Sequence, residues 1–151
     1  MKVNSKFTIN KLKMRRLSAA AVRSLEQTAE ALKTEVQQAQ VIPRDTGNLQ
    51  GEAFSVDLKD SRSGRVRLVH SAPYARRVYF NPDGMKFHKE KWYSYENAIN
   101  AKGKKYMKKI KHDGNPNAKD HWFEDWLPGG SKQDFCAKAF KRLYRRNAGL
   151  K

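Results

Sequence analysis

The chain has 151 residues, 38% of them apolar and 31% charged. This balance excludes an integral membrane protein, and an aromatic content of 11% argues against a disordered chain. Lys and Arg number 32 against 15 Asp and Glu, a net charge of +17, so we expect a surface that attracts a polyanion, either nucleic acid or an acidic neighbouring subunit.

The length predicts one domain over residues 1–151. No apolar run approaches the roughly 18 residues that span a bilayer, and the first residues lack a secretory signal. We therefore expect a protein made and kept in a cytoplasm, with no membrane contact. The single cysteine, Cys136, lies on an apolar helix face, which favours a packing role over a nucleophile.

The N-terminal region changes character after sixteen residues. Residues 1–16 contain six cations and no acid, which predicts a basic arm or short strand. From residue 17 to residue 40, apolar side chains recur at spacings of three and four, which predicts a long amphipathic helix. This helix must end before Pro43, because proline has no N–H to donate and restricts the residue before it.

The segment from Pro43 to Leu49 predicts a sharp corner. Asp45 and Thr46 are expected to accept hydrogen bonds from backbone N–H groups just downstream, Gly47 to adopt a positive φ, and Leu49 to re-enter the core. Asp-Thr-Gly is also the signature triplet of aspartic proteases. In those enzymes it follows a buried apolar strand, whereas here a helix and a proline precede it, so we interpret the segment as structural.

Residues 52–71 alternate between apolar and polar side chains on either side of a turn-rich stretch, which predicts a β-hairpin. Pro73 then precedes a short predicted helix over residues 74–80. Beyond the turn at residues 81–84, periodicity is lost, and we interpret residues 85–117 as a lysine-rich loop or insertion within the domain. Its Trp92 and Tyr95 are candidate subunit-interface residues.

Residues 102–111 interleave cations with apolar side chains, as a phosphate-contacting patch does. A solvated basic loop explains the pattern equally well. No base-reading motif is present, so non-specific DNA contact is the most that the pattern supports. The candidate polyanion contacts are Lys102, Lys104, Lys105, Lys108, Lys109 and Lys111.

The C-terminal third predicts two helical elements. Trp122, Phe123, Trp126 and Leu127 cluster at helical spacing, and the two tryptophans are either core residues or part of a subunit interface. After the break at residues 128–130, Ser131 with Asp134 resembles a capping box. A basic amphipathic helix is expected to follow.

The four histidines are scattered, and none has a His or Cys at the short spacings of zinc sites. His112 with Asp113, and Asp120 with His121, are conceivable parts of a nuclease centre. No acidic cluster accompanies them, and turn or helix signals explain these residues without catalysis. We therefore expect no metal, no cofactor and no enzymatic activity.

The order of these elements resembles the minor capsid, or head–tail connector and tail-completion, proteins of tailed bacteriophages. Three short motifs carry the resemblance, and their order carries more weight than any one of them. They extend from about residue 17 to residue 147 and comprise Pro43, Asp45, Thr46, Gly47 and Leu49, then Ser71, Tyr74, Ala75 and Tyr79, then Trp122 and Phe123.

The resemblance implies an α+β fold in which a long N-terminal helix and C-terminal helices flank a small, mostly antiparallel sheet. It also implies a ring of six copies in the virion neck, assembled in the host cytoplasm between portal and tail proteins, without cofactor or catalysis. A ring needs heterologous contacts. Our hypothesis is that residues 52–71 and 85–117 make them. The alternative is a non-specific nucleic-acid-binding basic module.

Overall fold

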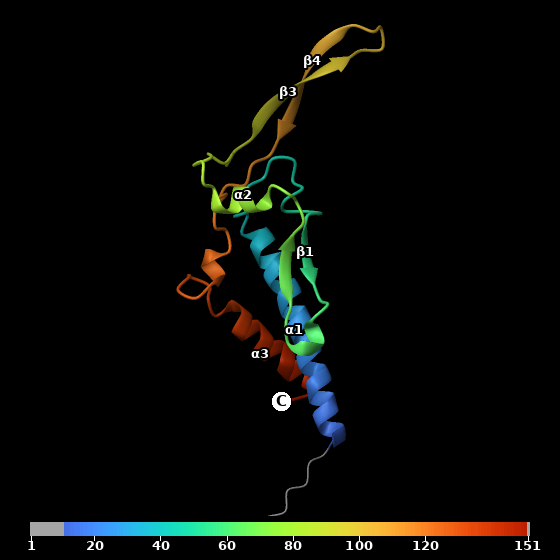
Figure 1. Cartoon of the computed structure of the whole chain (residues 1–151), viewed down its shortest axis with the longest axis vertical. Coiled ribbons are helices and arrows are strands. Elements are labelled where there is room, and N and C mark those ends of the chain that lie inside the picture. Colours follow the sequence, from blue (N-terminus) through green and yellow to red (C-terminus); the bar gives the residue numbers. More distant parts are fainter. Residues whose placement is uncertain (1–10, 151) are drawn as a thin grey trace, which may run out of the picture.

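The computed structural model describes residues 11–150 and has the predicted α+β class (Figure 1). Its four strands form two separate two-stranded antiparallel sheets, where the resemblance implies one small sheet. The elements in chain order are α1 (Lys11–Gln38), β1 (Phe54–Asp57), η1 (Ser61–Ser63), β2 (Arg67–His70), α2 (Ala75–Phe80), β3 (Trp92–Ile99), β4 (Lys105–His112), η2 (Glu124–Trp126) and α3 (Phe135–Ala148).

The predicted N-terminal helix is confirmed as α1, which ends at Gln38, ahead of Pro43. Residues 11–16 are already helical, so the predicted basic arm or strand is wrong there, and residues 1–10 lie outside the described part of the chain. Straight-chain lysine and arginine are good helix formers, which lets this basic stretch continue the helix. No helix within residues 11–150 is long and apolar enough to cross a bilayer.

Helices α1 and α3 pack against each other in antiparallel orientation (Figure 1). Lys132 Nζ lies 2.6 Å from Glu35 Oε1 at one end, and Asn147 Nδ2 donates to Ser24 Oγ at 2.9 Å near the other. Ser24 and Thr28 are buried in this contact, where their hydroxyls donate to helical carbonyls one turn earlier. Small side chains with satisfied hydroxyls thus let the two helices approach closely.

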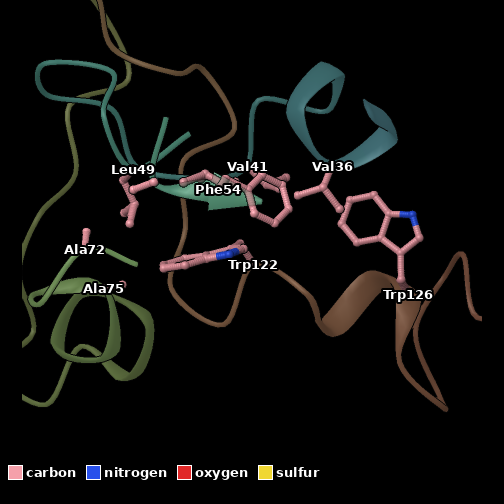
Figure 2. Close-up of a cluster of buried hydrophobic side chains, with 10 residues drawn as sticks. Val36, Val41, Leu49, Phe54, Ala72, Ala75, Trp122 and Trp126 are labelled. Atoms are coloured by element: carbon pink, nitrogen blue, oxygen red, sulfur yellow. The ribbon is translucent and has the colours of Figure 1, made fainter. Parts of the chain in front are cut away.

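The core lies between the end of α1, the β1–β2 hairpin, α2 and the segment before η2 (Figure 2). Trp122 is 1% exposed and Trp126 is 7% exposed. Core packing is therefore confirmed within this chain, and an interface role of these two tryptophans stays a prediction. The buried cluster comprises Val36, Val41, Ile42, Leu49, Ala53, Phe54, Ala72, Ala75, Trp122 and Trp126.

Two predictions about the C-terminal third are wrong. The Trp122 region is not an α-helix, because the chain turns around the core there and only η2, a three-residue 3-10 turn, forms. The capping box also fails. Ser131 is exposed in the turn ahead of α3, and Asp134, which flanks the helix, makes no side-chain capping bond. Gln133 Oε1 instead accepts from the Gly129 N–H at 2.9 Å.

The hairpin predicted over residues 52–71 is confirmed by β1 and β2, with Phe54 opposite His70 and Val56 opposite Leu68. These four side chains share one face, which meets the core. The short helix predicted over residues 74–80 is confirmed by α2.

The loop predicted over residues 85–117 contains a regular hairpin of two eight-residue strands, β3 and β4. It projects beyond α2, at the opposite end of the molecule from the start of α1 (Figure 1). Both of its faces carry exposed residues, so the alternation between apolar and polar side chains that marks a half-buried strand is weak. That is why the sequence pattern indicated a loop.

Candidate functional site

The projecting hairpin, residues 92–112, is hereafter called the arm. A stack of three rings holds its base. Trp92 lies between His88, at 4.4 Å between ring centroids, and His112, at 4.3 Å, and both planes are within 17° of parallel to the indole. Ser94 Oγ forms a hydrogen bond of 2.8 Å with His112 Nε2. Both ring faces of Trp92, a predicted interface residue, are thus covered by its own chain.

Gly114 lies where the returning strand rejoins the body. Its N–H donates to the Glu90 carbonyl at 3.1 Å. A Cβ at this position would lie 2.7 Å from that oxygen and would also collide with the His88 backbone. Only glycine lets the two ends of the arm approach this closely, a requirement that the sequence analysis missed.

The register of the arm sorts its side chains onto two faces, because directly opposite residues of an antiparallel pair point the same way. The tryptophan face carries Trp92, Ser94, Glu96, Ala98, Tyr106, Lys108, Ile110 and His112. The lysine–tyrosine face carries Tyr93, Tyr95, Asn97, Ile99, Lys105, Met107, Lys109 and Lys111.

The six lysines predicted to contact a polyanion are therefore not one patch. Three of them share the lysine–tyrosine face, Lys108 lies on the opposite face across from Glu96, and the other two belong to the connecting turn. That turn is held by Asn100, whose Oδ1 accepts from the N–H groups of Lys102 at 3.0 Å and Lys104 at 2.9 Å.

Large side chains are exposed on the lysine–tyrosine face. Tyr95, a predicted interface residue, is 59% exposed, Ile99 is 66% exposed and Met107 is 57% exposed. Lys109 Nζ lies 3.9 Å from the centre of the Tyr93 ring, a cation–π contact. Tyr93 was not among the predicted site residues. The sequence offered one signal for this face, the spacing of two residues. Tyr93 and Tyr95 precede the Asn100 turn at that spacing, and Lys109 and Lys111 follow the turn at the same spacing.

The motif Pro43 to Leu49 lines a groove of about 540 Å³ at the foot of the arm, together with Tyr74 and residues 85–88. Asn48 Nδ2 donates to Tyr74 Oη at 3.5 Å, so two of the three motifs that carry the family resemblance meet here. The third meets α2 instead, where Trp122 and Phe123 line a second, smaller groove with Tyr79.

The corner itself is built differently from the prediction. Asp45 and Thr46 are exposed, and within residues 11–150 their side chains make no hydrogen bond to the downstream backbone. Backbone bonds close the turn instead, since Gly51 N–H donates to the Gly47 carbonyl at 2.9 Å. The positive φ predicted for Gly47 is confirmed at +90°.

A buried asparagine ties the end of the arm segment to this corner. Asn115 is 1% exposed, and its Nδ2 donates to the Ile42 carbonyl and to Gln50 Oε1, both at 2.6 Å. The next turn adds a bond from Lys119 N–H to the Val41 carbonyl at 3.0 Å. No local sequence signal marks Asn115, because its partners lie more than sixty residues away.

His70 lines the second groove, beside Trp122 and Phe123. Its Nδ1 is 3.0 Å from the Leu49 carbonyl, which only accepts, so Nδ1 carries the proton. The ring stacks on Phe54 at 4.4 Å and meets the Trp122 ring edge-on. Burial lowers the pKa of His70 below its ordinary value, against a smaller opposing effect of the Leu49 hydrogen bond. This half-buried side chain packs against the core, and its lowered pKa favours the neutral form.

The residues considered for a nuclease centre do not form an acidic cluster. His112 belongs to the arm, whereas His121 lies 5.2 Å from the Tyr79 ring and 3.5 Å from Asp120 Oδ1. Among the described residues, no three His, Cys, Asp or Glu side chains gather as a metal site requires. Cys136 is half-buried in α3, and burial raises the pKa of its thiol, which disfavours the nucleophilic thiolate.

Comparisons with models of known protein families, with curated proteins and with solved structures gave no match to this chain. The family resemblance therefore stays a prediction, supported by motif order alone. The arm and the groove at its foot are the features of the structure that point to a function.

Proposed function

We propose that this protein is a structural assembly protein of a tailed-phage virion, a minor capsid or head–tail joining component of the neck. The arm is the observation that carries the proposal. Within residues 11–150, no helix or strand packs extensively against it. A two-stranded hairpin is marginally stable in water, and exposed apolar side chains of this size favour contact with another molecule.

The position of the arm supports a role in a ring. A ring of identical copies requires one surface to meet a different surface on the next copy. An arm that projects from one end of the body (Figure 1) can reach such a neighbour. The groove at its foot then stays available on the body. Under this proposal the ring has six copies and meets portal and tail proteins, with no cofactor and no catalysis.

An armless variant tests this proposal. Residues 93–111 are replaced by an Asn-Gly turn between Trp92 and His112, which keeps the ring stack at the base. Leu127→Ala is the control, because it removes one exposed apolar side chain that lies outside the arm. We expect the armless protein to melt close to the wild type but to lose oligomers in native mass measurement and to fail to complement virion assembly.

Complementation by the armless protein at the wild-type level would contradict the proposal. The genes beside this one provide a second, cheaper test. Portal, major capsid and tail-tube genes are expected there, and their absence from the neighbourhood would count against a neck component.

The second candidate is a non-specific nucleic-acid-binding basic module. It is favoured by the charge of the arm and its surroundings, because residues 100–112 contain six lysines and no acidic residue. Such a module retards duplexes of any sequence and releases them as salt rises. Magnesium-dependent degradation of DNA by the purified chain, abolished by substitution of His112 or His121, would contradict both candidates and favour a nuclease.

A further inference from the structure

We infer that the lysine–tyrosine face of the arm binds an unpaired, extended stretch of nucleic acid, with bases against the side chains of β3 and phosphates along the lysines of β4. The inference deepens the second candidate function and rests on it. It is compatible with a neck protein, because the arm then contacts a nucleic acid strand as well as its neighbours.

The two strands divide the chemistry of this face between them. β3 contributes the rings of Tyr93 and Tyr95 and the apolar side chain of Ile99, whereas β4 contributes the ammonium groups of Lys109 and Lys111. Residues two apart on a strand lie about 7 Å apart. That spacing is comparable with the separation of successive phosphates along an extended polynucleotide. The row of rings and the row of cations run side by side, as bases and phosphates do in one strand.

The cation–π contact brings one ammonium of β4 over a ring of β3. Lys109 lies directly opposite Tyr95, and its Nζ rests over the neighbouring Tyr93 ring. This contact favours one position of a flexible lysine before a ligand arrives, which lowers the entropy lost on binding. Tyr95 keeps its own ring largely exposed for a base to stack on.

Charge selects the class of partner. The lysine–tyrosine face has three lysines and no carboxylate, since the one acidic residue of the arm, Glu96, lies on the tryptophan face. The whole chain carries a net charge of +17, which adds to the positive potential of this face. A polyanion from outside the chain complements it.

The tyrosines select an unpaired strand over a duplex. Base planes inside a duplex are stacked on one another about 3.4 Å apart, and their faces are not accessible to a side chain. If this face contacted phosphates alone, the rings of β3 would contribute nothing to binding. Aromatic rings beside a basic track are the usual way in which proteins hold single strands without sequence preference.

The test measures binding of the full chain by fluorescence anisotropy, with a labelled oligothymidylate and a duplex of the same length. We expect tighter binding of the single strand. Tyr95→Ala should weaken it about tenfold, Tyr95→Phe should retain it, and both variants should melt like the wild type. Tyr106→Ala is the matched control, because Tyr106 is an exposed tyrosine on the opposite face of the same hairpin.

The lysines give an independent measurement. Joint substitution of the three face lysines, Lys105, Lys109 and Lys111, by glutamine should reduce the slope of log affinity against log salt by about 2. The matched control removes the same charge from elsewhere in the arm, at Lys102, Lys104 and Lys108. We expect that control to change the slope less.

Three results would overturn the inference: duplex binding as tight as single-strand binding, equal effects of Tyr95→Ala and Tyr106→Ala, or displacement of the oligonucleotide by polyglutamate at equal charge. The last would identify an acidic protein as the partner. Binding to no nucleic acid at all would remove the second candidate function too. Salt-sensitive binding that Tyr95→Ala does not weaken would remove only this inference and would leave the second candidate function standing.

Discussion

Replacing Asn115 by alanine should destabilise the protein more than its position in an irregular segment would indicate. Asn115 is 1% exposed, and its amide donates to the Ile42 carbonyl and to Gln50 Oε1 at 2.6 Å each. The Ile42 carbonyl follows α1 and leads into the corner at Pro43. Alanine leaves this buried oxygen without its donor, and the tie between the corner and the segment after the arm is lost.

The magnitude follows from the burial of the two acceptors. Leaving the Ile42 carbonyl unpaired costs about 1–3 kcal/mol, and the bond to half-buried Gln50 contributes about 1 kcal/mol more. The expected loss is therefore about 2–4 kcal/mol of unfolding free energy. For a chain of this size, it corresponds to a fall in Tm of about 5–15 °C.

Asn117→Ala is the matched control for this measurement. Asn117 Nδ2 also donates to a carbonyl after α1, that of Ala39, at 2.9 Å, but the side chain is exposed and water replaces the lost bond. Thermal unfolding followed by circular dichroism compares the two variants. If Asn115→Ala melts no lower than Asn117→Ala, the buried hydrogen bonds of Asn115 do not stabilise the link between the corner and the segment after the arm.

Three further predictions concern the corner, the foot of the arm and the core histidine. Gly47→Val should lower the free energy of unfolding in denaturant by at least about 1–2 kcal/mol, because valine disfavours a φ of +90°. Asp45→Asn should change it by no more than about 0.5 kcal/mol. A folded Asp45→Asn protein that no longer supports assembly would contradict a purely structural corner. Gly114→Ala should lower the free energy of unfolding by about 1–3 kcal/mol and speed amide exchange in β3 and β4, because the added Cβ collides with the backbone of residues 88–90. Unchanged amide exchange would argue against that collision. Because the pKa of His70 is lowered in the folded state, the unfolded chain binds a proton at this residue more readily. The contribution of His70 to stability is therefore complete above the ordinary pKa of 6.5 and is lost as pH falls below that value. Urea midpoints across that range should fall more steeply for the wild type than for His70→Phe, and parallel curves would show that His70 does not titrate on unfolding.

The sequence determined the elements whose signals are local. The spacing of apolar residues from 17 to 40 was sufficient for α1, because a helix with one buried stripe must repeat every three or four residues. Alternation around residues 52–71 was sufficient for β1 and β2, since only one face of that hairpin meets the core. The corner at Gly47 was predictable because a positive φ favours glycine.

The tertiary structure decided the features that depend on contacts between residues far apart in the sequence. Trp122 has the same local pattern whether it packs in the core or in an interface, and only the chain around it shows that it is buried. β3 and β4 expose residues on both faces, so their hairpin follows from cross-strand hydrogen bonding and not from hydrophobic alternation. The division of the lysines between two faces follows from that register, because shifting a strand by one residue exchanges its faces. Composition determined only the net charge of +17, whereas the register of the arm placed three of its lysines on the same face as two exposed tyrosines.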